Sequence, residues 1–122
     1  MGHRILIVDD SGFSRATIRK ILEEAGLEVV GEAKNGVEAL DQIELLQPDL
    51  ITLDNILPDM TGLEILRVLR EQEIVANVIM ISAVGQRSAI EEGLHLGAKK
   101  YMIKPFTADK LLEEVREVLE IT

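Results

Sequence analysis

The sequence of 122 residues predicts an α/β protein with a doubly wound parallel sheet of five strands and a helix after each strand. Short unbroken aliphatic runs, typical of strands buried on both faces, recur along the chain. Between them, apolar residues repeat every three or four positions, as in amphipathic helices. Strict alternation of the two patterns favours right-handed crossovers between parallel strands. The predicted strands are residues 5–8, 27–33, 50–53, 77–82 and 99–103.

The first strand and helix have clear boundaries. The strand, 5–8, is entirely aliphatic and is followed by Asp9 and Asp10. Helical periodicity begins at Phe13 and stops at Gly26, a residue that commonly ends helices. The sequence therefore predicts a buried strand, an acidic loop and an amphipathic helix.

The second strand and helix give a weaker pattern. Two glutamates interrupt strand 27–33, so we expect it nearer to an edge of the sheet. A Lys-Asn-Gly turn at 34–36 leads into a helix that starts near Val37. This helix must end before Pro48, because the residue preceding proline avoids the helical conformation.

The third strand, 50–53, is short, apolar and followed directly by Asp54. Leucines at every third position from Leu63 then mark a helix. The fourth strand, 77–82, precedes a short helix over 88–96, which we expect to be the least stable because it contains a glycine.

The last strand, 99–103, precedes the clearest amphipathic stripe of the chain, which ends at Leu119. Thr107 is the expected N-cap of this helix. Asp109 in the first turn suits the positive end of the helix dipole.

Composition limits the classes of function. Acidic residues outnumber basic ones, 22 to 13, and the formal charge of −9 argues against nucleic-acid binding, because phosphate contacts need clustered Lys and Arg. The chain has no cysteine, which excludes disulfides and sulfur-ligated metals. It shows no secretory signal and no apolar run of membrane-spanning length. We expect a single cytoplasmic domain, residues 1–122, that binds neither membrane nor nucleic acid.

Polar residues end or follow four of the five predicted strands. These are Asp9 and Asp10 after the first, Asp54 after the third, Ser82 at the end of the fourth and Lys104 after the fifth. Taken singly, each has an ordinary explanation as a cap, a turn residue or a solvated side chain. Because the carboxyl ends of parallel strands meet at one edge of the sheet, their joint placement indicates a functional site.

Three carboxylates in one crevice repel one another, by about 3 kcal/mol per pair at ~5 Å and an effective dielectric constant of ~20. A hard divalent cation relieves this repulsion. Mg²⁺ usually combines one or two carboxylates with phosphate oxygens. A carboxylate can also act as a nucleophile and form an aspartyl phosphate, while a lysine and a hydroxyl hold the phosphoryl oxygens. The sequence therefore predicts Mg²⁺-dependent phosphoryl transfer to Asp54.

The motifs around these residues resemble the receiver domain of two-component response regulators, of the single-domain type. The resemblance covers the whole chain and implies a flavodoxin-like fold with strand order 2-1-3-4-5 and five helices on two faces. The motifs are Ile-Leu-Ile-Val-Asp-Asp-Ser (5–11), Gly-Glu-Ala (31–33) with Asn-Gly (35–36), Leu-Asp (53–54) with Pro-Asp-Met (58–60) and Gly62, Ile-Ser-Ala (81–83), Gly-Ala-Lys (97–99) and Ile-Lys-Pro-Phe (103–106).

The resemblance implies a role for each site residue. Asp54 would accept a phosphoryl group from a phosphohistidine on a sensor histidine kinase or a histidine phosphotransfer protein. Asp10 and Asp54 would bind Mg²⁺ directly, together with the backbone carbonyl of Ile56, and Asp9 would act mainly through water. Lys104 would pair with the phosphoryl oxygens.

Two further residues would carry the signal to the surface. Ser82 would move to bond the phosphoryl group, and Tyr101 would turn inward into the space that Ser82 leaves. The peptide bond before Pro105 is expected to be cis, which would set the direction of the preceding lysine. The face formed by helix 88–96, strand 99–103 and the last helix would change and be read by a downstream protein.

The same resemblance implies a signalling switch and not an enzyme with a separate substrate, because such a domain catalyses only its own phosphorylation and slow dephosphorylation. We expect a monomer. The alternative is a dimer through the face that the downstream protein would read.

Three positions near the site bear on this interpretation. Ser82 stands where threonine is as familiar in the family, so the hydroxyl is retained. Asn55 follows the acceptor where an apolar residue is more usual, and the sequence offers no explanation for it. Ile56 is apolar and has no group that could orient a hydrolytic water, which predicts a long-lived phosphoryl group.

Two other functions share parts of the pattern. A haloacid dehalogenase-type phosphatase also uses an Asp nucleophile and Mg²⁺, but it needs a carboxylate two residues later, where this chain has Ile56. A flavodoxin or an unphosphorylated receiver-like binding module shares the fold. Against a flavodoxin, Asp9 and Asp10 stand in the loop that would have to donate to a phosphate. Against the unphosphorylated module, the expected acceptor, metal and lysine residues are all present.

The remaining candidates have simpler structural interpretations. We expect the two histidines, His3 and His95, to be solvated. Met60 and Met102 are expected to fill the core. A solvated acidic face of the last helix is expected at Glu113, Glu114, Glu117 and Glu120.

Overall fold

The computed structural model describes residues 3–121, which form five strands and five helices in strict alternation. The strands are β1 (Arg4–Val8), β2 (Glu28–Ala33), β3 (Leu50–Leu53), β4 (Asn77–Ser82) and β5 (Lys100–Ile103). The helices are α1 (Gly12–Glu24), α2 (Gly36–Leu46), α3 (Gly62–Glu71), α4 (Arg87–His95) and α5 (Ala108–Leu119). The predicted alternation is therefore confirmed, with element ends that differ from the expected ones by one or two residues.

The strands form one parallel sheet in the order β2-β1-β3-β4-β5. This order confirms the predicted doubly wound, flavodoxin-like topology and the edge position of the second strand. β2 is only partly buried along most of its length, whereas all four residues of β3 are buried. The central position of β3 brings the residue that follows it, Asp54, to the middle of the sheet edge.

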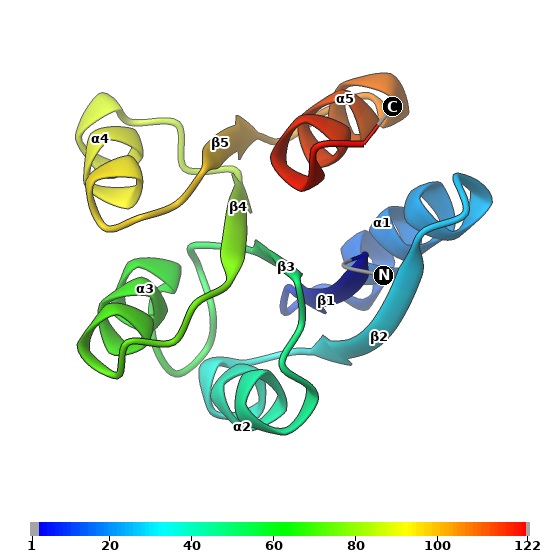
Figure 1. The fold of residues 1–122 in the computed structure, drawn as a ribbon. Coiled ribbons are helices and arrows are strands. Elements are labelled where there is room, and N and C mark those ends of the chain that lie inside the picture. Colours follow the sequence, from blue (N-terminus) through cyan, green and yellow to red (C-terminus); the bar gives the residue numbers. More distant parts are fainter. Residues whose placement is uncertain (1–2, 122) are drawn as a thin grey trace.

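Helices cover both faces of the sheet. α1 and α5 lie on one face, and α2, α3 and α4 lie on the other (Figure 1). Alternate residues of β1 serve the two cores: Ile5 and Ile7 pack with Leu22 of α1, and Leu6 and Val8 belong to the opposite core. Because both faces are covered, a central strand shows no polar alternation in the sequence.

The helices begin at side-chain caps in four of five cases. The hydroxyl or amide oxygen of the N-cap residue accepts a backbone N–H at α1, α2, α3 and α5, and Thr107 is the cap of α5 as predicted. α4 follows Gln86, whose side chain makes no such bond. α4 therefore combines an uncapped start with an internal glycine, Gly93.

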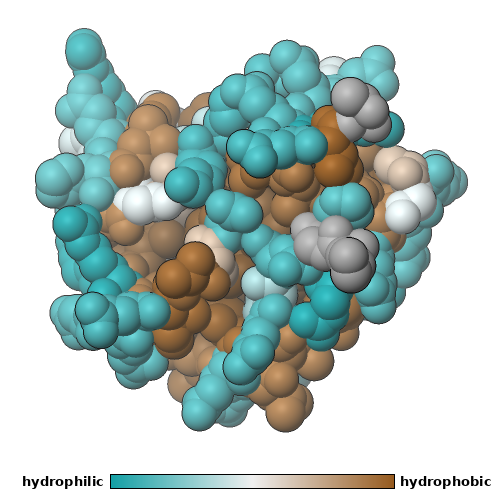
Figure 2. Space-filling view, in the orientation of Figure 1, coloured by the Kyte–Doolittle hydropathy of each residue, from teal (hydrophilic) through white to brown (hydrophobic). Residues whose placement is uncertain are grey.

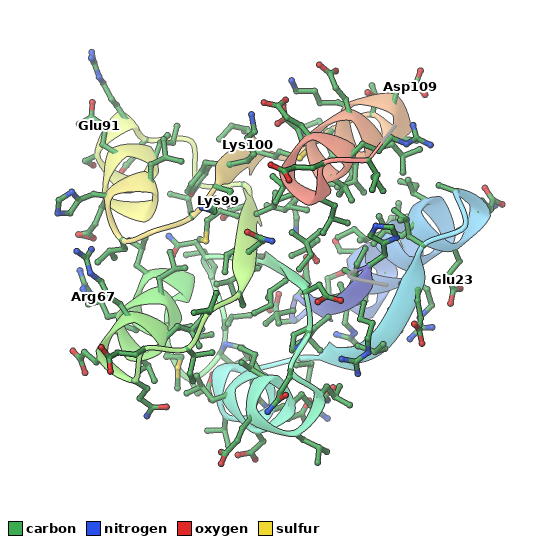
Figure 3. All side chains as sticks on the ribbon, viewed as in Figure 1. Glu23, Arg67, Glu91, Lys99, Lys100 and Asp109 are labelled. Atoms are coloured by element: carbon green, nitrogen blue, oxygen red, sulfur yellow. The ribbon has the colours of Figure 1, made fainter. Side chains whose placement is uncertain are left out.

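The acidic face predicted for the last helix is only partly solvated, which corrects the expectation for Glu114. This residue is 8% exposed and pairs with Lys110 (2.7 Å) and Lys100 (3.3 Å). Lys100 reaches it from β5, which lies beside α5 (Figure 3). A buried carboxylate needs such partners, because removing its charge from water is costly.

On the face drawn in Figure 2, hydrophobic patches lie between hydrophilic side chains. Charged residues of the helices, such as Glu23, Arg67 and Asp109, point outward (Figure 3). Within residues 3–121, none of the helices combines the length and the apolar composition needed to cross a bilayer.

Candidate functional site

The carboxyl ends of β1 and β3 bring three acidic residues together. Asp9 and Asp54 are buried, with side chains that are 2% and 9% exposed, and Asp10 is exposed beside them. Carboxylate oxygens of the three residues lie within 4.8 Å of one another. The two central strands are adjacent and parallel, so the residues that follow them must converge.

Lys104 connects two of these carboxylates from the end of β5. Its Nζ donates to Oδ2 of Asp9 (2.6 Å) and to Oδ2 of Asp54 (3.1 Å). Burial by itself lowers the pKa of Lys104, but the bonds to the two carboxylates outweigh that effect, and the net shift is upward. The lysine is therefore a charged group aimed at the acceptor candidate.

Backbone groups hold the remaining oxygens of the buried carboxylates. The N–H of Ser11 donates to Oδ1 of Asp9 (2.9 Å), and the N–H of Ile56 donates to Oδ1 of Asp54 (3.1 Å). Arg15 of α1 donates to the backbone carbonyl of Asp9 (2.7 Å) and is itself held by a glutamate of β2. Sequence analysis missed Arg15, since a helical arginine carries no signal of its backbone partner.

The two predicted switch residues both bond to the backbone of Val84. Ser82 is fully buried, and its Oγ accepts from the N–H of Val84 (3.2 Å). The hydroxyl of Tyr101, a half-buried residue of β5, donates to the carbonyl of Val84 (2.6 Å). Burial raises the pKa of Tyr101 and keeps the phenol protonated as a donor. Sequence analysis did not identify Val84, because it acts only through its backbone.

Asn55 acquires an explanation from its contacts with α3. Its side-chain oxygen accepts from the N–H of Leu63 (3.2 Å), and its backbone carbonyl accepts from the N–H of Gly62 (2.8 Å). A Cβ at Gly62 would lie 2.6 Å from the carbonyl oxygen of Asp54, so only glycine permits this approach. Asn55 thus binds the first two backbone N–H groups of α3 and fixes the start of that helix beside Asp54.

The acidic cluster fits a hard divalent cation. Three carboxylates and one ammonium leave a formal charge of −2 at the site. All the donors are oxygens, and carboxylate oxygens are the ligands that Mg²⁺ prefers. The peptide bond between Lys104 and Pro105 is cis. The structure therefore supplies a metal-compatible donor set that includes the buried carboxylate of Asp54.

A hollow of about 550 Å³ lies away from the acidic cluster and does not define the site. It lies between β5 and α5 and is lined by Tyr101 and Phe106 but by none of the three clustered aspartates. A smaller hollow of about 330 Å³, lined by Phe13 and Phe106, opens beside Lys104. An ion and a phosphoryl group need little volume, so the converging charges identify the site better than cavity size does.

Comparison with known proteins shows which family combines this fold and this site. The sequence profile of the response regulator receiver domain matches residues 5–116. Chemotaxis protein CheY of Bacillus subtilis is 43% identical over 119 residues, which are 98% of this chain and 99% of the relative. CheY of Thermotoga maritima is 38% identical over 97% of this chain and 98% of its own.

Solved structures agree with the sequence matches. The crystal structure of a CheX–CheY–BeF3–Mg²⁺ complex from Borrelia burgdorferi matches with a TM-score of 0.89 at 34% identity, and the match covers 94% of this chain and 87% of that chain. The described fold, the family profile and the near-complete overlap with CheY proteins lead to one assignment. The chain belongs to the response regulator receiver domain family.

Proposed function

We propose that this single domain, residues 1–122, is a phosphorylation switch in which Asp54 accepts a phosphoryl group from a phosphohistidine. The donor would be a sensor histidine kinase or a histidine phosphotransfer protein. One observation carries the proposal: the carboxylate of Asp54, 9% exposed, lies within 4.8 Å of two other carboxylates and 3.1 Å from the ammonium of Lys104. This arrangement joins a nucleophile, a cation and metal-compatible oxygens at one point.

The transfer exchanges one bond for another. An oxygen of Asp54 attacks the phosphorus and forms an O–P bond while the P–N bond to the donor imidazole breaks. The electron pair stays on the ring nitrogen, which takes a proton from solvent. Lys104 pairs with the phosphoryl oxygens, and its raised pKa keeps it charged for that role.

Asp10, Asp54 and the backbone carbonyl of Ile56 would hold Mg²⁺, with Asp9 acting mainly through water. When bound, Mg²⁺ neutralises charge that develops on the phosphoryl oxygens. The surroundings of Asp9 suit an indirect role, because its two oxygens already accept from Lys104 and from the N–H of Ser11.

Ser82 and Tyr101 would convert the modification into a change of surface. A phosphoryl group at Asp54 offers a charged acceptor to the Ser82 hydroxyl, which now accepts from Val84. Movement of Ser82 would release the N–H of Val84 and shift the backbone of that residue, whose carbonyl accepts from the Tyr101 hydroxyl. The affected face is formed by α4, β5 and α5 and contains the hollow of about 550 Å³.

A downstream protein would read that face, and the CheY relatives make a chemotaxis target the first candidate. The Borrelia CheY was crystallised with CheX, BeF3 and Mg²⁺, which supports a receiver that binds both a metal and a protein partner. We propose a monomeric switch that catalyses only its own phosphorylation and slow dephosphorylation. A general phosphatase is disfavoured, because an isoleucine occupies the position where its second carboxylate would stand.

Phosphorylation is tested by intact mass after incubation with acetyl phosphate and Mg²⁺. We expect the wild type to gain one phosphoryl group, and we expect no gain in Asp54→Asn or in wild type with EDTA. Asp109→Asn is the matched control, since this exposed aspartate lies in the first turn of α5 and should leave the gain unchanged. Peptide mapping should place the group on Asp54. A wild type that gains no mass would contradict the proposal and leave a receiver fold used as a constitutive binding module.

A further inference from the structure

The loop between β3 and α3 is attached to the start of α2 by Asp59. One oxygen of Asp59 accepts from the N–H of Gly36 (2.7 Å), and the other accepts from the N–H of Val37 (3.0 Å). These N–H groups belong to the first turn of α2 and have no partner within their own helix. The bond to Gly36 is the main reason that the pKa of Asp59 is lowered. Asp59 is thus an ionised acceptor of two bonds from an element 22 residues away in sequence.

The neighbouring Met60 strengthens this attachment by packing. Its side chain occupies the space where a Cβ at Gly36 would lie, so the glycine provides a notch for the methionine. Two consecutive loop residues therefore bind the first turn of α2, Asp59 by hydrogen bonds and Met60 by packing. Neither Asp59 nor Met60 has a part in the proposed phosphoryl transfer.

The other end of the loop lies at the acceptor. The N–H of Ile56 donates to Oδ1 of Asp54 (3.1 Å), and Ile56 forms an antiparallel bridge with Thr61. The loop is thus closed on itself. Leu57 is buried in the core, and Asn55 bonds to the start of α3. Asp59 adds the hydrogen-bonded attachment to α2, which holds the part of the loop that follows Ile56.

We infer that Asp59 is a positioning residue that holds the loop so that the Ile56 backbone stays beside the acidic cluster, and that Mg²⁺ affinity depends on it. The inference rests on the proposed function, in which the Ile56 carbonyl is a metal ligand. Removing a residue that does not bind the metal itself but orients one of its ligands commonly lowers the metal affinity by ~10–100-fold. Because Asp59 acts through the loop, we expect the lower end of that range.

The competing explanation is that Asp59 is only a second cap of α2. Asn35 already caps this helix, since its side-chain oxygen accepts from the N–H of Glu38 (2.8 Å). Asn35 makes no contact with the β3–α3 loop among the described hydrogen bonds. It therefore offers a matched control: Asn35→Ala weakens the same end of α2 but leaves the loop attached.

The experiment measures Mg²⁺ dissociation constants by isothermal titration calorimetry, and thermal unfolding without Mg²⁺, for wild type, Asp59→Ala, Asp59→Asn and Asn35→Ala. We expect Asp59→Ala to raise the dissociation constant about tenfold. Asp59→Asn keeps one carbonyl oxygen and should fall between Asp59→Ala and the wild type. Asn35→Ala should lower the melting temperature as much as Asp59→Ala does and leave the dissociation constant within about twofold of wild type.

Equal dissociation constants for wild type and Asp59→Ala would overturn the inference, and so would equal losses of affinity in Asp59→Ala and Asn35→Ala. In both cases the proposed function would stand, because wild-type binding would have been observed. A wild type that does not bind Mg²⁺ would instead overturn the metal-dependent function, and the inference with it.

Discussion

Asp54 is distinguished from the other aspartates by its contacts. It follows a fully buried strand, accepts from the N–H of Ile56 and faces the ammonium of Lys104. A buried carboxylate with a fixed cationic partner is held in one orientation, whereas an exposed aspartate rotates freely in water, and this orientation suits the proposed role of Asp54 as a nucleophile. The properties that single out Asp54 among the aspartates therefore come from its contacts with Ile56 and Lys104 and not from the residue type.

Ile56 is the residue for which the lifetime of the modification can be predicted. It is 54% exposed, follows the proposed acceptor by two positions and has no polar side-chain atom to orient an attacking water. We expect the wild-type phosphoryl group to last minutes, and Ile56→Asn to shorten its lifetime about tenfold because the amide can position water. Loss of the added mass over time measures both. A lifetime of seconds in the wild type without a phosphatase would contradict the prediction, and Ile56→Leu is the control.

Among the five helices, α4 has the fewest stabilising features. It has no side-chain cap and contains Gly93, whose flexibility costs roughly 1 kcal/mol relative to alanine in a helix. It contributes only Gly93 to the buried residues, whereas α3 contributes four. α4 also belongs to the face that would change on phosphorylation, and elements that move are drawn from the less stable parts of a fold.

Gly93→Ala tests this account of α4. A Cβ at Gly93 would lie 3.4 Å from Cδ2 of Tyr101 and 3.6 Å from Cδ2 of Leu63, which are ordinary contacts. We expect the substitution to raise the free energy of unfolding by about 0.5–1 kcal/mol in urea titrations. Gly62→Ala should lower it, because its Cβ would lie 2.6 Å from a backbone oxygen. A loss of stability in Gly93→Ala would show that the glycine is required for close packing.

The attachment of α5 to β5 should depend on pH through Glu114. The bond to Lys110 lowers the pKa of Glu114, burial opposes that shift, and Lys100 reinforces it. Because the folded-state pKa lies below the ordinary value of 4.5, the stabilisation is present above that value and is lost as the pH falls through the folded-state pKa.

Glu114→Gln should therefore lower the free energy of unfolding by about 1 kcal/mol at pH 7. The difference in the free energy of unfolding between Glu114→Gln and wild type should become smaller as the pH falls below 4.5, because the wild-type carboxylate becomes protonated. Urea titrations at neutral and acidic pH measure both values. The exposed Glu113→Gln is the control, and a difference that stays constant with pH would rule out this pair as the cause.

For the whole molecule, we expect the proposed binding of Mg²⁺ at the acidic cluster to change the global stability. The residues of this cluster follow β1 and β3, two central strands, so their mutual repulsion acts on the middle of the sheet. A cation that binds only the folded chain stabilises it by RT ln(1 + [L]/Kd), which is about 1.4 kcal/mol at ten times Kd.

Mg²⁺ at ten times its Kd should therefore raise the melting temperature by about 5 °C in calorimetry. Asp10→Asn should abolish this rise, since Asp10 is the exposed member of the cluster and a proposed direct ligand. NaCl at matched ionic strength is the control for general screening. An equal rise with NaCl would show that no specific metal site is involved.

The order and type of the elements follow from local sequence patterns alone. Unbroken aliphatic runs and helical periodicity assigned all five strands and five helices within residues 3–121, and the alternation required parallel strands. It also brought Asp9, Asp54, Ser82 and Lys104 to one edge, because residues that end parallel strands share an edge whatever their distance in sequence. The sequence also marks Asn55 as unusual for its position, and the bond from Leu63 explains it.

Only the tertiary structure decided which polar atoms meet. Glu114 was expected in water but is buried against Lys100, because β5 passes beside α5. Asp59 stands in a recognised motif, yet its partner Gly36 lies 23 residues earlier. Arg15 reaches the backbone of Asp9 by the same kind of contact between elements. Periodicity reports which face of an element is apolar, whereas polar partners depend on how separate elements pack, and that information is absent from any local stretch of sequence.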